Sequence, residues 1–185
     1  MAKTFVFEGS DLVGKSTTAR AIAEKNSFRL ERNVTVHDAY QLVASICEDI
    51  ERARVRNSCG GTTTLFDRWQ LVSDIVYNDC LFGSYSRVLP FVNEFALECK
   101  KAGIYFIVLT CSDKEELTRR YNHRGDDDCT LEEVLAVHEA YISFFTNGAG
   151  MRFPHVIIDV ANKNIAEAIS EVEGYIRRLG GMSNE

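Results

Sequence analysis

A glycine-rich loop near the start of the chain constrains the fold more than any other feature. The stretch GSDLVGKST, which begins at residue 9, matches the pattern G-x-x-x-x-G-K-[ST] at every defined position. Thr4–Glu8 before it is a short apolar run rich in β-formers, and Lys15–Lys25 after it has the spacing of a helix. A strand, such a loop and a helix in this order predict a site that holds the phosphates of a nucleotide.

The residue types of this loop explain how it would hold phosphates. Glycines let successive backbone N–H groups converge on an anion, and the start of a helix adds partial positive charge. Lys15 can reach the β- and γ-phosphates of ATP, and the Ser16 hydroxyl can ligate Mg²⁺. The residues that we expect to bind ATP are Gly9, Ser10, Asp11, Leu12, Val13, Gly14, Lys15, Ser16 and Thr17.

Strand patterns and helix patterns alternate along the rest of the chain. The expected strands are Thr4–Glu8, Asn33–His37, a run that ends at Asp67, Ile104–Thr110 and Val156–Val160. The expected helices are Lys15–Lys25, Tyr40–Val55, Leu71–Asn78, Arg87–Lys101, Asp113–His123, Leu131–Phe145 and Ile165–Leu179. Alternation of this kind predicts an α/β fold of three layers, with a mainly parallel five-stranded sheet covered by helices on both faces. No linker divides residues 1–185, so we expect a single domain.

Both the glycine loop and Asp67 follow directly on predicted strands. Ligands of parallel sheets collect beyond the carboxyl ends of the strands, so we expect these two features to lie in one crevice. There Asp67 can orient hydrated Mg²⁺ or accept a proton from an attacking oxygen. The next residue, Arg68, offers a fork of donors that suits a phosphate.

Composition excludes several classes of protein. A net charge of −6 argues against binding of a nucleic acid polymer, which depends on many Lys and Arg contacts. No segment approaches the roughly 20 apolar residues that span a bilayer, so we expect no membrane association. The six cysteines form no C-x-x-C pair, which argues against zinc. With no signal peptide before Thr4, we expect reduced thiols, a cytoplasmic location and ordinary structural histidines.

Other nucleotide-binding classes lack their own signatures here. A GTPase needs the guanine-reading pattern Asn-Lys-x-Asp, and the nearest candidate, at 162–165, reads NKNI. A dinucleotide-binding fold would show G-x-G-x-x-G, which the chain does not contain. A motor ATPase usually needs a larger chain. A small kinase that acts on a small acceptor molecule is the class that remains.

Two motifs together resemble those of the thymidylate kinases. That family carries E-G-x-D-x-x-G-K-[ST]-T, for which this chain supplies Glu8, Gly9, Asp11, Gly14, Lys15, Ser16 and Thr17. The family also carries D-R-Y-x-x-S-x-x-A-Y-Q, which here reads Asp67, Arg68, Trp69, Ser73, Val76, Tyr77 and Asn78. The resemblance implies a P-loop kinase that uses ATP and Mg²⁺ to phosphorylate a deoxynucleoside monophosphate, with dTMP as the first choice. It also implies a homodimer.

The resemblance assigns roles on the acceptor side of the site. Asp11 would contact the sugar 3′-hydroxyl of the acceptor nucleotide. Arg68 would bind the acceptor's phosphate or bridge the two phosphates. Ser73, Tyr77 and Asn78 would lie along the pocket for the base and the sugar.

The segment TRRYNHRGDDD, within residues 113–128, resembles the lid of the same family. Arg120 and Arg124 are four residues apart and share one face of a helix. Some family members carry an arginine in the phosphate loop after the aspartate, but this chain has Leu12 there. We therefore expect the lid arginines to stabilise the charge on the transferred group, with Arg124 as the first choice.

The chain departs from the family where the base is read. Family members carry Arg-Glu-Pro or a relative after the second strand, whereas this chain reads HDAY at 37–40. Asp38 could instead deprotonate a nucleoside 5′-hydroxyl, which would make the protein a deoxynucleoside kinase. A third alternative, from another class, is a nucleotide-binding regulator that does not turn over.

Overall fold

The computed structural model describes residues 2–32, 38–81, 83, 86–124 and 129–182. Its strands are β1 (Thr4–Glu8), β2 (Arg29–Arg32), β3 (Thr64–Asp67), β4 (Ile104–Thr110) and β5 (His155–Asp159). Its helices are α1 (Lys15–Asn26), α2 (Ala39–Ser58), α3 (Gln70–Leu81), α4 (Val92–Ala102), α5 (Lys114–Arg124), α6 (Leu131–Thr146) and α7 (Ile165–Arg178). Two short 3₁₀ helices, Leu89–Phe91 and Ala149–Arg152, precede α4 and β5.

The five strands form one sheet in the order β2-β3-β1-β4-β5, with every neighbouring pair parallel. The register pairs Phe7 of β1 with Asp67 of β3 and with Ile107 of β4. β1 is buried along its whole length because it lies in the middle of the sheet. Its carboxyl end delivers the glycine loop to the centre of the sheet edge.

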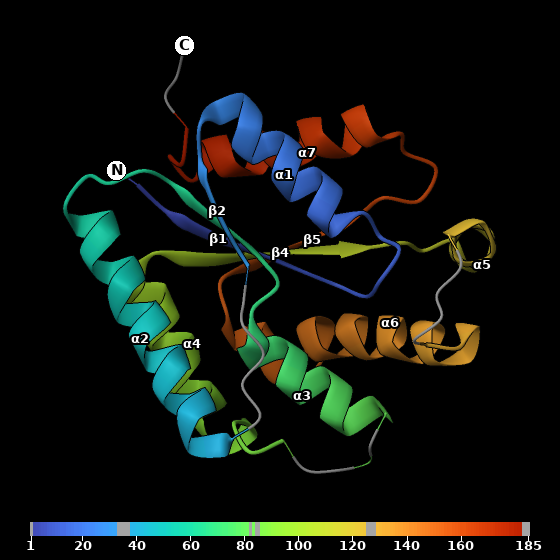
Figure 1. Cartoon of the computed structure of the whole chain (residues 1–185), viewed down its shortest axis with the longest axis horizontal. Helices are drawn as coiled ribbons and strands as arrows, with labels where there is room; N and C mark the ends of the chain where they lie inside the picture. Colours follow the sequence, from blue (N-terminus) through green and yellow to red (C-terminus); the bar gives the residue numbers. More distant parts are fainter. Residues whose placement is uncertain (1, 33–37, 82, 84–85, 125–128, 183–185) are drawn as a thin grey trace.

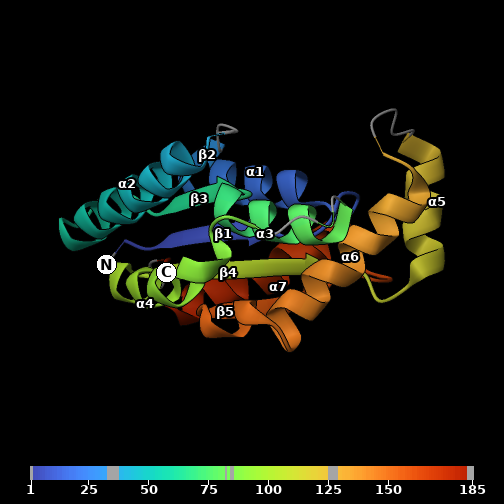
Figure 2. The same cartoon turned by 90° about the horizontal axis from the view of Figure 1, so that it is seen from below.

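Helices cover both faces of the sheet, so the molecule has three layers (Figure 1). Side chains alternate along β1: Phe5 and Phe7 pack in the core beneath α1 and α7, while Val6 packs in the core beneath α2, α3, α4 and α6. Figure 2 shows α5 at the end of the sheet, next to the beginning of α6. Helix α6, which follows the lid segment, therefore extends from α5 back along the sheet.

The structure confirms the expected fold class. The predicted strand Asn33–His37 lies outside the described residues, and the described edge strand, β2, is the preceding RLER segment. The predicted helix Arg87–Lys101 begins later than expected, at Val92, because Pro90 lies in a short 3₁₀ turn before it. Within the described residues, no helix combines the length and the apolar character needed to cross a membrane.

Candidate functional site

The glycine loop joins β1 to α1 in a backbone conformation that only some residues can adopt. Gly9 has φ of 131°, and a Cβ atom there would lie 2.2 Å from the carbonyl oxygen of Leu109 on β4. Gly14 has φ of 83° and directly precedes α1. The first glycine lets the loop pass close to β4, and the second opens the backbone at the start of the helix. The loop has the geometry of a phosphate cradle.

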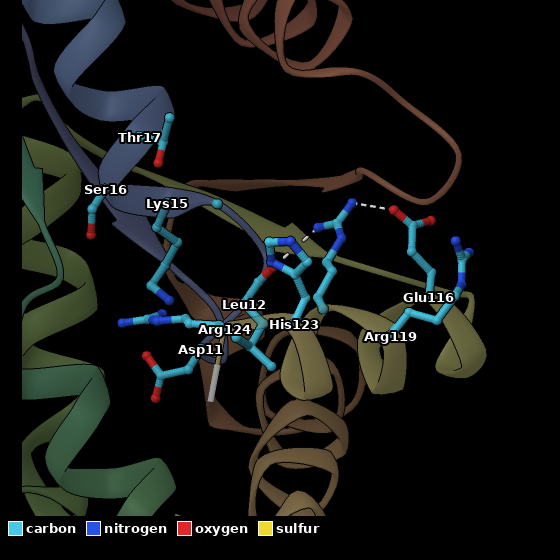
Figure 3. A pocket seen from close by; sticks show the side chains of 11 residues that line it. Asp11, Leu12, Lys15, Ser16, Thr17, Glu116, Arg119, His123 and Arg124 are labelled. Atoms are coloured by element: carbon cyan, nitrogen blue, oxygen red, sulfur yellow. Dashed lines mark hydrogen bonds and ion pairs between the residues drawn. The ribbon is translucent and has the colours of Figure 1, made fainter. Parts of the chain in front are cut away.

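A cavity of about 670 Å³ opens between this loop and α5 (Figure 3). One wall comes from the loop and the start of α1, and the other wall comes from the lid helix. The loop wall holds the Lys15 ammonium, and the lid wall holds three arginines. The residues that line the cavity are Asp11, Leu12, Gly14, Lys15, Ser16, Thr17, Glu116, Arg119, Arg120, His123 and Arg124.

Lys15 is buried, with only 5% of its surface exposed, and its Nζ donates a hydrogen bond to the carbonyl oxygen of Ser10. Burial, and after it the positive charge of Arg68, lower the pKa of Lys15 to about 7. Among the residues that the structure describes, the Ser10 carbonyl is the one hydrogen-bond acceptor of the buried Lys15 Nζ. The negative charge of an incoming phosphate would stabilise the ammonium form of Lys15.

The lid helix is already joined to the loop through Arg120. Its Nη1 donates to the carbonyl oxygen of Leu12 at 3.0 Å, and its Nη2 forms an ion pair with Glu116 one turn earlier in α5. Glu116 Oε2 in turn accepts from the backbone N–H of Asn162 at 2.8 Å, in the loop after β5. Arg120 therefore connects three segments that are far apart in the sequence.

Arg124, at the end of α5, differs from Arg120 in its surroundings. In Figure 3 its side chain extends from α5 toward the part of the cavity where Lys15 and Asp11 lie. Arg119 lies at the other end of the lid wall, near Glu116. The two lid arginines named by the sequence thus face the same cavity as the phosphate loop, and Arg119 and His123 join them.

Asp11 links the phosphate loop to the segment after β3. Its Oδ1 accepts from Arg68 Nη2 at 2.7 Å, and its Oδ2 accepts from the Tyr77 hydroxyl at 3.3 Å. The Arg68 guanidinium lies over the Tyr77 ring, 5.4 Å from its centre. Arg68 has φ of 69°, an uncommon backbone conformation for a non-glycine residue. This backbone conformation directs the Arg68 guanidinium toward Asp11 of the phosphate loop.

Glu8 is a fully buried carboxyl group beneath this contact. Its Oε1 accepts from the backbone N–H of Trp69 at 2.8 Å, and its Oε2 accepts from the Tyr141 hydroxyl at 3.2 Å. Burial raises the pKa of Glu8 to about 7, although both hydrogen bonds and the charges of Arg68 and Lys15 oppose the rise. The carboxyl group ties the end of β1 to the end of β3 and to α6.

The remaining predicted site residues occupy different positions. Asp67 ends β3 beside β1, and the Ser73 hydroxyl lies 3.4 Å from that of Tyr141. Asn78 donates to the backbone and carboxylate oxygens of Asp74 in its own helix. Asp38 is exposed and caps α2 by accepting from Gln41 N at 3.0 Å. The predicted site residues outside the glycine loop that are not among those lining the cavity are Asp38, Asp67, Arg68, Ser73, Tyr77 and Asn78.

The chain offers few metal ligands of its own. No group of three or more His, Cys, Asp and Glu residues able to hold a metal ion occurs in the part of the chain that the structure describes. The Ser16 hydroxyl is exposed at the start of α1, and Asp67 ends the neighbouring strand. Mg²⁺ in nucleotide sites usually takes one or two protein ligands and completes its shell with phosphates and water. Ser16 and Asp67 fit that pattern.

Comparisons with known proteins give the fold class. No family model matches the sequence, and no curated protein is significantly similar to it. Among solved structures, the YorR protein of Bacillus subtilis in complex with phosphorylated GDP is similar at 14% identity and a TM-score of 0.72, over 98% of this chain and 100% of that one. Thymidylate kinase of Candida albicans is similar at 16% identity and a TM-score of 0.64, over 100% of this chain and 96% of that one.

Deoxyadenosine kinase of M. mycoides with bound dCTP is a further similar structure, at 17% identity and a TM-score of 0.59, over 95% of this chain and 99% of that one. The similarity extends over whole chains in each case. The chain therefore has the α/β fold of the P-loop kinases.

Several residues of the site are not apparent from the sequence. Tyr141 and His138 come from α6 and reach the site only through tertiary packing. Glu8 does carry a signal, because a carboxyl group at the end of an apolar strand is costly unless it has partners. Arg119 and His123 share the lid helix with the predicted arginines, and nothing in the sequence separates them from a solvated helix face.

Proposed function

We propose that this protein is a kinase that transfers the γ-phosphoryl group of ATP, with Mg²⁺, to a deoxynucleoside monophosphate, with dTMP as the preferred acceptor. The observation that carries the proposal is the contact between Asp11 and Arg68. This contact holds the Arg68 guanidinium against Asp11 of the phosphate loop, and Asp11 also lines the cavity whose other wall carries the lid arginines. It supports Arg68 as the ligand for the acceptor's phosphate.

Each side of the cavity has a separate task in this reaction. The loop amides and Lys15 hold the donor phosphates, and Ser16 and Asp67 would hold the metal, which supplies charge neutralisation when it is bound. Arg68 and Asp11 orient the acceptor's phosphate and sugar. Arg124 approaches from the lid and stabilises the negative charge on the transferred group.

Arg120 contributes in a more restricted way. Two of its N–H donors are used by the Leu12 carbonyl and by Glu116, which fixes the distance between loop and lid. Closing the lid over the cavity also excludes water, which limits wasteful hydrolysis of ATP. Because an arginine carries five N–H donors, Arg120 can meet a phosphate with the others while it keeps both partners.

The decisive experiment is a panel of nucleosides and nucleoside monophosphates, each mixed with Mg²⁺ and ATP and scored for ADP release. We expect rapid ADP release with dTMP and little with thymidine or with no acceptor. A panel in which monophosphates are inert and nucleosides react would overturn the monophosphate assignment. ADP release that no acceptor accelerates would instead support a regulator or a simple ATPase.

One observation favours a second candidate, a deoxynucleoside kinase. The arginines of α2 form ion pairs within their own surroundings: Arg52 with Asp49, Arg54 with Glu51 and Glu98, and Arg56 with Glu31. These carboxylates lie away from the phosphate loop, whereas Arg68 is held by Asp11 of the loop itself, so the α2 arginines do not add to Arg68 as ligands for an acceptor phosphate. A nucleoside acceptor would need no such ligands, and Asp38 would then be the candidate base.

A further inference from the structure

Helix α6 places two buried polar side chains against the site from behind. His138 and Tyr141 are 2% and 0% exposed and lie three residues apart, so they share one face of the helix. The helix begins directly after the lid, at a capping box made by Thr130 and Glu133. Burying an imidazole and a phenol costs more free energy than burying apolar side chains, unless their polar atoms form hydrogen bonds. The partners of these two side chains therefore indicate what they do.

His138 contacts the phosphate loop. Its Nε2 lies 3.0 Å from the carbonyl oxygen of Cys111, which can only accept, so Nε2 carries a proton. Its Nδ1 lies 3.0 Å from the Ser10 hydroxyl. Burial lowers the pKa of the ring, which favours the neutral form, in which Nδ1 can only accept. The Ser10 hydroxyl can give its one proton to Nδ1 at 3.0 Å or to the carbonyl oxygen of Asp11 at 3.2 Å. Because the carbonyl of Ser10 accepts from Lys15, the orientation of this residue bears on the donor side of the site.

Tyr141 contacts the other side of the site. Its hydroxyl donates to Glu8 at 3.2 Å, and Glu8 holds the backbone N–H of Trp69. Trp69 directly follows Arg68, whose backbone is in the left-handed conformation. The Tyr141 ring also meets the Tyr77 ring edge to face, with ring centres 6.3 Å apart. None of these hydrogen bonds and ring contacts involves Ser10 or Lys15, and Lys15 acts on Glu8 only through its charge.

We propose that α6 positions the two halves of the site separately, with His138 setting the phosphate loop through Ser10 and Tyr141 setting Arg68 through Glu8. The inference rests on the proposed function for its assignment of donor and acceptor sides. Both residues are positioning residues, since each acts through another side chain. A change at either one should therefore alter the binding of one substrate and leave the other unchanged.

Calorimetric binding of two probes tests this separation. The donor probe is the non-hydrolysable ATP analogue AMP-PNP with Mg²⁺, and the acceptor probe is dTMP. We expect His138→Gln, which keeps a donor for Cys111 but loses the acceptor for Ser10, to raise the Kd of AMP-PNP by about three- to tenfold, as for one lost hydrogen bond. Tyr141→Phe should raise the Kd of dTMP by about the same factor.

Three variants serve as matched controls. Val137→Ala removes buried methyl groups from the same helix, where Val137 packs in the core, without touching Ser10 or Glu8. It should lower the melting temperature and leave both Kd values within about twofold of the wild type. His138→Asn, which keeps an acceptor near the Nδ1 position, should partly restore AMP-PNP binding. Ser10→Ala combined with His138→Gln should add little to either single change.

Equal effects of each variant on the binding of both probes would overturn the inference. If His138→Gln and Tyr141→Phe weaken both probes equally, or if Val137→Ala reproduces their effects, the helix acts only through overall stability. Amide hydrogen exchange of the ligand-free protein decides the matter even if the wild type binds neither probe, a result that would overturn the proposed function. Exchange should rise in residues 9–15 for His138→Gln and in residues 67–70 for Tyr141→Phe, and equal rises in both segments would contradict the separation.

Discussion

The two sides of the proposed site, the donor side and the acceptor side, are built by different means. The donor side is a continuous stretch of nine residues, in which the backbone of Gly9 and Gly14 sets the shape. The acceptor side is assembled from side chains on separate elements: Asp11 of the loop, Arg68 after β3 and Tyr77 of α3. One side is encoded locally, whereas the other exists only once the sheet and helices have packed.

This difference has a physical consequence for how each side tolerates change. A loop held by backbone conformation keeps its N–H groups aimed at an anion whatever many of its side chains are. A cluster of side chains depends on every partner, because removing one leaves another charge without its counterpart. Substitutions should therefore damage the donor side through a few residues and the acceptor side through many.

The largest expected effect comes from the charge on the donor side. Lys15→Ala should lower acceptor-dependent turnover by about 10³-fold, since it removes the buried ammonium that faces the donor phosphates. Steady-state ADP release measures the loss. Lys25→Ala, an exposed lysine at the other end of α1, is the matched control and should retain turnover within about twofold. Equal losses in both variants would contradict a specific role for Lys15.

The lid is expected to act mainly on the rate. Arg124→Ala should lower kcat by about 10²-fold and leave the KM of ATP within about threefold, because its charge meets the transferred group and not the bound donor. Asn122→Ala, at an exposed position on the same helix, should change neither constant. An unchanged kcat for Arg124→Ala would remove this residue from the mechanism.

The acceptor side should respond through affinity. Asp11→Asn removes the charge that holds Arg68 and should raise the KM of the acceptor by about tenfold, as for a lost hydrogen bond to a charged group. The KM of ATP should stay within about twofold, because the loop backbone does not depend on this carboxylate. Kinetics with each substrate varied separately measure the two constants. A rise in the KM of ATP alone would place Asp11 on the donor side.

The smallest expected effect is an uptake of protons on binding. The pKa values of Lys15 and Glu8 are both about 7, so both groups are mostly deprotonated at pH 8. A bound triphosphate favours the ammonium form of Lys15 and the neutral form of Glu8, so both changes have the same sign. Affinity for AMP-PNP should therefore fall as the pH rises above 7.

Calorimetry at pH 8 in two buffers of different ionisation enthalpy measures this uptake. We expect an uptake on the order of one proton, divided between the coupled groups. Lys15→Met should take up fewer protons than the wild type. A release of protons, or an uptake that Lys15→Met leaves unchanged, would contradict the electrostatic description of the donor side.

The sequence predicts the donor side well because its structure is local. Seven consecutive residues, Gly9–Lys15, carry the glycines and the lysine at fixed spacing, and the flanking strand and helix are apparent from their periodicity. The five-stranded parallel sheet follows from the alternation of elements for the same reason. The start of α4 was predicted five residues too early, because the Pro90 turn was read as part of the helical pattern.

The acceptor side is only partly predictable because its partners come from distant elements. The place of Arg68 after a predicted strand predicts a phosphate ligand, and motif resemblance predicts a role for Tyr77, but their shared carboxylate, Asp11, lies 57 and 66 residues away. Tyr141 lies 133 residues from Glu8, and no periodicity or composition indicates that contact. The ion pairs of Arg54 with Glu98 and of Arg56 with Glu31 likewise join distant segments and are visible only in the folded chain.

The central claim is that two nucleotides meet phosphate to phosphate between the loop and Arg68. Binding of adenosine and thymidine joined through five phosphates tests it most directly, with the four-phosphate analogue for comparison. We expect a single molecule of the five-phosphate compound to bind each chain and to exclude both AMP-PNP and dTMP, and to bind more tightly than the shorter one. A compound that displaces AMP-PNP while dTMP still binds alongside it would contradict the claim.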